Sequence, residues 1–216
     1  MRDLQSLFMG AINEEQARIA NRRGVLGGGA KVVAGGAAAI AVAGAPALAK
    51  LVAAQDFESD VDVLNYALTL EHLEFAFYRD GLEGFAAEDF EEGVYDNLLL
   101  VRDHEGDHVD TLVSVITDLG GEPVEEGEYD FGYEDADGFL SVAAALENTG
   151  VSAYDGAAAS LESVDLLNAA GTIVAVEARH ASYLNLVTGE NPFPEAFETP
   201  LSPDEVLEIA GDFIVQ

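Results

Sequence analysis

Apolar residues recur at helical spacing in four long stretches of the chain. Residues from about 60 to 79, 94 to 119, 137 to 161 and 164 to 187 place apolar side chains three and four positions apart, which is the period of an amphipathic helix. Ser59 and Ser163 stand where helix N-caps are expected, and Gly81, Gly120 and Gly189 stand where helices end. The pattern therefore predicts four long α-helices.

The segments between these stretches indicate how the helices are arranged. Short connections join the first stretch to the second and the third to the fourth, so the helices of each pair are expected to be antiparallel. Residues 122–136 join the second stretch to the third; they are acidic, contain Pro123 and two glycines, and show no period. About fifteen extended residues span roughly 50 Å, whereas a helix of about twenty residues is ~30 Å long. This connection can cross the whole bundle, so the third helix starts parallel to the second.

A short final helix completes the predicted fold. Ser202-Pro203-Asp204-Glu205 combines a serine cap, a proline in the first turn and a glutamate three residues after the serine, and the helix reaches about Phe213. The expected fold is all-α. It is a four-helix bundle with one long crossover between helices two and three, plus a short C-terminal helix.

Two of the predicted helices carry a glutamate and a histidine three residues apart within their apolar stripe. Glu105 and His108 share a helix face with Leu112, and Glu177 and His180 lie on the same kind of face. The chain has four histidines, and two of them follow a glutamate by three positions. A carboxylate is costly to bury in such a stripe unless a metal ion or a basic partner compensates its charge.

The two halves of the chain repeat this pattern. The helix before each Glu-x-x-His pair carries a lone glutamate followed seven residues later by a tyrosine: Glu71 with Tyr78, and Glu147 with Tyr154. Two cations a few ångströms apart need several anionic ligands, and carboxylates suit hard or borderline ions. Two lone glutamates and two Glu-x-x-His pairs, distributed over four helices, are the ligand set of di-iron and di-manganese carboxylate bundles.

From about Asp56 to the C-terminus, the chain resembles the ferritin-like domain of desiccation-related and stress proteins. Four motifs carry the resemblance: Leu70-Glu-His-Leu-Glu-Phe-Ala-Phe-Tyr78, His104-Glu-x-x-His108, Leu146-Glu147 with Tyr154, and Val176-Glu-Ala-Arg-His-Ala181. More remotely, the alternation of motifs is similar to bacterioferritin and rubrerythrin, which bind two irons. The chain lacks a further glutamate on the third helix and the Cys-rich iron domain of rubrerythrin, which argues against peroxidase activity.

The resemblance implies a site for two metal ions, with iron favoured and manganese second. It gives Tyr78 and Tyr154 hydrogen-bonding roles beside the ions, assigns no catalytic residue, and implies six ligands: Glu71, Glu105, His108, Glu147, Glu177 and His180. Glu74 competes with Glu71 as a ligand, and the matching tyrosine at plus seven favours Glu71. His72 and His104 are expected to lie off the metal face. A buried proton or salt bridge in place of metal stays open as an alternative.

Charge narrows the choice of partners. Lys and Arg number 9 against 41 Asp and Glu, which gives a formal charge of −32. Residues 50–216 hold 4 basic and 38 acidic residues, a charge of −34. Such a surface repels nucleic acid and anionic lipid, and it is typical of adaptation to very high salt, where screening lengths shrink to a few ångströms. The absence of cysteine excludes disulfides and thiolate metal sites.

Residues 1–49 are interpreted as a targeting segment. Asn21-Arg22-Arg23-Gly24-Val25-Leu26 resembles the twin-arginine export signal, and it precedes a Gly/Ala/Val run and the small-x-small cleavage site Ala47-Leu48-Ala49. The run borders on spanning length, so a retained membrane anchor is the alternative to cleavage. The expected organisation is a signal segment at 1–49 and a ferritin-like domain at 50–216, exported to the cell surface or secreted.

Two functions remain open from the sequence. The first is an exported di-iron or di-manganese oxidoreductase that handles oxygen, peroxide or ferrous iron. The second is a non-enzymatic stress or desiccation-related protein that keeps the fold with or without metal. Neither has a nucleic acid partner, both are expected to be monomers or small homo-oligomers, and membrane attachment requires an uncleaved N-terminal segment.

Overall fold

The computed structural model describes residues 57–215, and these residues form helices and loops without a β-strand. Their five α-helices are α3 (Asp60–Gly81), α4 (Val94–Asp118), α5 (Ala136–Ala158), α6 (Val164–Val187) and α7 (Pro203–Ala210). All the elements discussed below belong to the unit that comprises Val42–Pro194 and Pro200–Gln216. The expected all-α fold with four long helices is confirmed. The predicted signal segment at 1–49 lies outside the described residues.

Side-chain caps fix where the helices begin. The hydroxyl oxygens of Ser59, Ser163 and Ser202 each accept a hydrogen bond from a backbone N–H three residues on, and Asp135 caps α5 in the same way. The boundaries differ from the expectation mainly at two helix ends. Helix α7 stops at Ala210 instead of about Phe213, because residues 211–213 form a separate 3-10 turn, and α5 stops at Ala158 instead of Leu161. There the chain tightens into turns in which the N–H groups of residues 160 and 161 donate to the carbonyls of residues 157 and 158.

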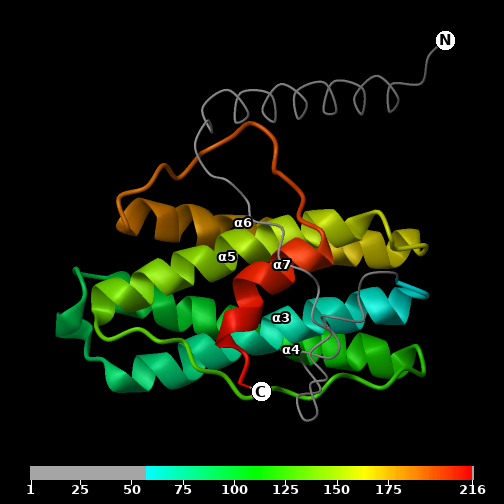
Figure 1. Ribbon diagram of the computed structural model, residues 1–216, viewed down its shortest axis with the longest axis horizontal. Helices are drawn as coiled ribbons and strands as arrows, with labels where there is room; N and C mark the ends of the chain where they lie inside the picture. Colours follow the sequence, from blue (N-terminus) through cyan, green and yellow to red (C-terminus); the bar gives the residue numbers. More distant parts are fainter. Residues whose placement is uncertain (1–56, 216) are drawn as a thin grey trace, which may run out of the picture. The chain divides into compact units, whose positions relative to one another are not determined.

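The four long helices form two antiparallel pairs (Figure 1). The first pair is α3 with α4, the second is α5 with α6, and α3 also packs against α5. Residues 119–135 run along the length of the bundle, from the end of α4 to the start of α5 (Figure 1). As a result α5 runs in the same direction as α4. The predicted long crossover is therefore confirmed.

Two polar side chains on α3 hold the crossover against the bundle. The side-chain amide of Asn65 donates to the Glu122 carbonyl at 3.2 Å and its oxygen accepts from the Val124 N–H at 2.7 Å. His72 Nε2 lies 3.2 Å from the Val124 carbonyl. The C-terminal segment completes this side, because Tyr129 and Ile214 form an isolated antiparallel bridge. The crossover is thus held at residues 122–124 and at Tyr129, and these contacts fix its path to the start of α5.

The apolar core is divided into two clusters along the bundle. Phe77 and Phe139 stack with their ring centroids 4.4 Å apart in the first cluster, where Tyr78 is also fully buried. The second cluster gathers Leu68, Ile116 and neighbouring apolar side chains near the start of α3 and the end of α4. The two clusters enclose the mid-helix positions that carry the candidate ligands.

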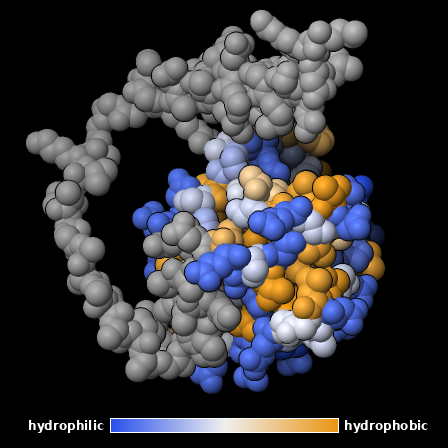
Figure 2. Space-filling model, turned by 90° about the vertical axis from the view of Figure 1, so that its right-hand side faces the viewer, coloured by the Kyte–Doolittle hydropathy of each residue, from blue (hydrophilic) through white to orange (hydrophobic). Residues whose placement is uncertain are grey.

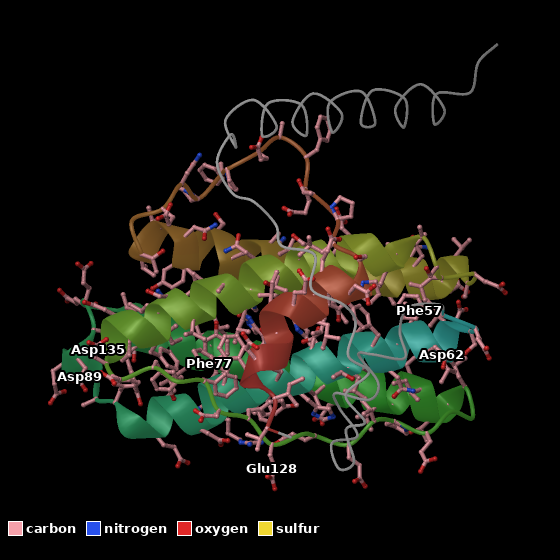
Figure 3. The ribbon with its side chains drawn as sticks, in the orientation of Figure 1. Phe57, Asp62, Phe77, Asp89, Glu128 and Asp135 are labelled. Carbon is pink, nitrogen blue, oxygen red and sulfur yellow. The ribbon has the colours of Figure 1, made fainter. Side chains whose placement is uncertain are left out.

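The outside of the bundle is acidic and carries few cations. Exposed carboxylates such as Asp89 and Glu128 surround the core that contains Phe77 (Figure 3). Arg79 forms ion pairs with Asp80 and Glu126 at 2.6 and 2.9 Å. Among the described helices, none is both long enough and apolar enough to cross a membrane.

Candidate metal centre

All six predicted ligands meet in the middle of the bundle, and all four long helices contribute to this centre. Each of the four glutamates among them has no solvent exposure, and His180 is 5% exposed. The helical period explains the arrangement: Glu105 and His108 are three residues apart on α4, and Glu177 and His180 are three apart on α6. One turn therefore presents a carboxylate and an imidazole together.

The side chains fall into two overlapping groups, each with four potential ligand atoms within 4.8 Å of one another. In the first group, His108 Nδ1 lies 3.2 Å from Glu71 Oε2, 3.1 Å from Glu105 Oε2 and 3.0 Å from Glu177 Oε1. In the second group, His180 Nδ1 lies 2.9 Å from Glu105 Oε1 and 3.2 Å from Glu147 Oε2. The groups are Glu71, Glu105, His108 and Glu177, and Glu105, Glu147, Glu177 and His180.

The overlap gives the glutamates two different positions. Glu105 and Glu177 belong to both groups, whereas Glu71 belongs only to the first and Glu147 only to the second. The centre thus has two carboxylates shared by both groups, and at each end one further carboxylate and one imidazole. This arrangement can hold two cations side by side. This geometry agrees with the predicted set of residues.

Tyr78 and Tyr154 each form a hydrogen bond with the lone glutamate of the other half of the repeat. The Tyr78 hydroxyl donates to Glu147 Oε1 at 2.8 Å, and the Tyr154 hydroxyl donates to Glu71 Oε1. The two hydrogen bonds link α3 with α5 in both directions. They hold the two end carboxylates and leave the other oxygen of each, Glu71 Oε2 and Glu147 Oε2, facing an imidazole.

Burial and crowding shift the ionisation of this centre. Burial, together with the charge of Glu177, raises the pKa of Glu105 to about 7. Burial likewise raises the pKa of Glu147 and raises that of Glu177 well above its ordinary value. Burial alone would lower the pKa values of the histidines, but close contacts with carboxylates outweigh it and raise them to about 12 for His108 and about 10 for His180. Without metal, protonated imidazoles therefore compensate the carboxylates.

The centre nevertheless contains buried oxygens without a hydrogen-bond donor. Glu105 Oε1 and both carboxylate oxygens of Glu177 have no hydrogen-bond partner among the described residues. The nearby imidazole nitrogens lie within 3.0 Å of two of these oxygens but are not aligned for a hydrogen bond. Orphaned carboxylate oxygens are costly in a core. They belong to the two shared glutamates, where a pair of cations would be bound, so the residues fit a metal pair.

Glu74, which the sequence offered only as an alternative to Glu71, lies at the centre in addition to Glu71 as a fifth buried carboxylate. Its side chain is 3% exposed, and burial followed by the charges of Glu177 and Glu147 raises its pKa well above its ordinary value. It stands over Gly150 of α5, where a Cβ atom would lie 2.8 Å from Glu74 Oε1. Glu74 is outside both four-residue groups. The preference for Glu71 over Glu74 agrees with this placement.

His104 lies beside the centre, contrary to the expectation that it would be an ordinary helix residue off the metal face. Its Nδ1 is 2.9 Å from His180 Nε2, and the two rings stack with their centroids 5.2 Å apart. Since His180 Nδ1 faces the carboxylates, its Nε2 faces away from them toward His104. The sequence signal was present, because His104 directly precedes Glu105, but it required knowledge of how α4 packs on α6. His72 does lie away from the centre, against the crossover.

The fold and the centre define a class: a four-helix bundle with one long crossover and a buried carboxylate–histidine cluster shared by all four helices. The ferritin-like domain family matches residues 59–190, and the chain belongs to this family. A crystal structure of a conserved hypothetical protein from Mycobacterium tuberculosis is similar, with 21% identity and a TM-score of 0.52 over 68% of this chain and 99% of that one. This likeness supports the fold alone. No curated protein matches the chain.

Proposed function

We propose that this protein binds two metal ions in the bundle and uses them to handle oxygen, peroxide or ferrous iron. The observation that carries the proposal is the pair of overlapping ligand groups that share Glu105 and Glu177. Iron is the favoured metal and manganese the second, because carboxylate and imidazole ligands suit borderline and hard divalent ions. Glu71, His108, Glu147 and His180 would complete the two ligand groups.

Charge balance supports a filled centre. Four ligand carboxylates match the four positive charges of two divalent ions, so the filled centre would be near neutral. Each ion would replace the proton that an imidazole now holds, because a ligating histidine must be neutral. Tyr78 and Tyr154 would keep the end carboxylates oriented through their hydrogen bonds. The complete burial of the four glutamates keeps bulk water away from the ions.

Bound iron would supply one-electron chemistry, with ferrous iron as the reductant and oxygen or peroxide as the oxidant. The direct test is to load the protein anaerobically with ferrous iron, add oxygen and follow iron oxidation by absorbance. Glu105→Gln removes a carboxylate shared by both groups and is expected to slow oxidation strongly, whereas the exposed Glu83→Gln is a control that leaves it unchanged. Equal rates in wild type, Glu105→Gln and buffer would contradict the proposal.

A second candidate, a stress protein without redox chemistry, is favoured by one observation. The imidazoles of His108 and His180 already neutralise much of the buried carboxylate charge. The fold does not require metal for this compensation. Such a protein would show the same thermal stability in the presence of a chelator and of ferrous iron or manganese.

Export and adaptation to high salt belong to the same proposal. The motif at Arg22-Arg23 supports export in folded form by the twin-arginine route. Replacing both arginines by lysine should leave the protein in the cytoplasm on cell fractionation. Unchanged export would contradict the twin-arginine route.

The −34 charge of residues 50–216 supports a requirement for molar salt. A melting temperature that does not rise with salt would refute that requirement.

A further inference from the structure

Beside the carboxylate centre, the bundle contains an apolar cavity. Its volume is about 90 Å³, and all four long helices line it near the start of α3 and of α6. Apolar side chains dominate its wall, among them Leu64, Ala67, Leu112, Ala170 and Ile173. Figure 2 faces this end of the bundle and shows hydrophobic side chains gathered there. Neither the motifs nor the ligand groups account for this space.

Tyr154 is shared between the cavity and the candidate metal centre. Its ring lines the cavity, and its hydroxyl donates to Glu71, an end carboxylate of the first ligand group. One side chain therefore separates the apolar space from the ligands. Thr111 on α4 and Thr172 on α6 also line the cavity and are exposed, so its mouth lies between these helices. The cavity therefore lies between this mouth and Tyr154, whose hydroxyl contacts the centre.

The cavity is dry in character but not wholly apolar. Tyr66 lines it, and its buried hydroxyl has no hydrogen-bond partner among the described residues. An engineered cavity of comparable lining and ~150 Å³ stays dry and binds benzene or xenon. The hydroxyls of Thr111 and Thr172 at the mouth already donate to the carbonyls of Asp107 and Ala169, and the Tyr154 hydroxyl donates to Glu71. The Tyr66 hydroxyl alone offers too few partners for a stable water, which needs two to four. A small apolar molecule with weak acceptor atoms therefore fits this space better than water does.

We propose that this cavity binds dioxygen and admits it to the carboxylate centre past Tyr154. Dioxygen is small and apolar, and its atoms can accept a weak hydrogen bond from Tyr66. The delivery step rests on the proposed function, because it assumes that the centre reacts with oxygen. The binding step stands on the cavity alone. No bond is made or broken in the cavity itself.

Xenon tests the binding step, because it occupies the same kind of dry space and is visible to X-rays. Crystals of the protein under xenon pressure should show a xenon atom in the cavity. Ala170→Leu fills the space and should lose the xenon atom. Ala175→Leu makes the same change at an exposed position of α6 and should retain it. Ordered water on Tyr66 in place of xenon in the wild type would overturn the proposal.

Single-turnover oxidation tests the delivery step. Ferrous-loaded Ala170→Leu should oxidise several-fold more slowly than Ala175→Leu at limiting oxygen, with unchanged metal content. Ala67→Leu fills the same cavity from α3 and serves where Ala170→Leu fails to fold. Equal rates in filled and control variants would overturn delivery through the cavity. A wild type that binds xenon but no metal would contradict the proposed function and leave the binding site in place.

Discussion

His104 and His180 form a contact that makes the two halves of the centre unequal. If His180 Nδ1 gives its lone pair to an ion, its Nε2 carries the proton and donates to His104 Nδ1 at 2.9 Å. Burial lowers the pKa of His104, which keeps it neutral and able to accept. The residue before Glu177 is Val176, which has no such group. Only one half therefore has a histidine that orients its ligand.

Replacing His104 by alanine should accordingly weaken the binding of one metal ion. The loss of an orienting partner is expected to reduce the affinity for that ion by roughly 10–100-fold. Anaerobic titration should then resolve one tight and one weak ion per chain. His72→Ala serves as the control, because His72 contacts the crossover instead of the centre. Two ions of unchanged affinity in His104→Ala would contradict this role.

The six residues that meet at the centre could be predicted from the sequence because local spacing defines them. A glutamate and a histidine three apart share a helix face in any helix, and the doubled pattern shows which pairs matter. Glu74 and His104 could not be placed in this way. Whether Glu74 points into the centre depends on the small residue opposite it, Gly150, and the contact of His104 depends on where α6 packs. Both are contacts between helices.

Gly150 and Gly156 in α5 show the same limit of sequence-based prediction at the level of a helix, because their role depends on which element packs against them. Within the sequence they only weaken the helix, since glycine is poorer than alanine in a helix interior. In the structure each makes room for a neighbour. A Cβ on Gly150 would crowd the Glu74 carboxylate, and one on Gly156 would overlap the Leu201 carbonyl. The helix gives up intrinsic propensity so that α3 and the segment before α7 can approach it.

Gly150→Ala should therefore destabilise the protein, although the same change normally stabilises a helix by up to ~1 kcal/mol. The added methyl would lie 2.8 Å from Glu74 Oε1 and 3.6 Å from Glu177 Oε2. Gly171→Ala on α6 is the matched control, because nothing lies within 4 Å of its added Cβ. Chemical denaturation in high salt compares the two. If Gly150→Ala is as stable as Gly171→Ala, the Glu74 carboxylate does not need the space at Gly150.

The response of the whole protein to pH follows from the raised pKa values of the buried histidines. Their folded-state pKa values are about 12 for His108 and about 10 for His180, above an unfolded value of 6.5. The stability that their protonation contributes is complete below pH 6.5 and is lost as pH rises through the folded-state values. Glu105, raised from 4.5 to about 7, acts in the same direction.

Without metal, the melting temperature should therefore fall as pH rises from about 6.5 to about 9.5. Surface carboxylates stay ionised throughout this window, so the buried centre determines the change. With manganese the stabilisation by metal should grow with pH, because protons compete with the ions for the ligands. Melting curves in molar salt, with chelator and with manganese, measure both trends. A metal-free melting temperature that rises with pH would contradict the effect expected from the buried histidines.

The number of metal ions per chain tests the central claim most directly. Protein purified in high salt and incubated with ferrous iron or manganese is analysed for metal and protein content. Wild type and the exposed-site control Glu83→Gln should contain about two ions per chain. Glu147→Gln should contain fewer, and Tyr154→Phe should keep both. A wild type that stays metal-free, and whose melting temperature changes with neither metal, would contradict the claim that this centre binds metal.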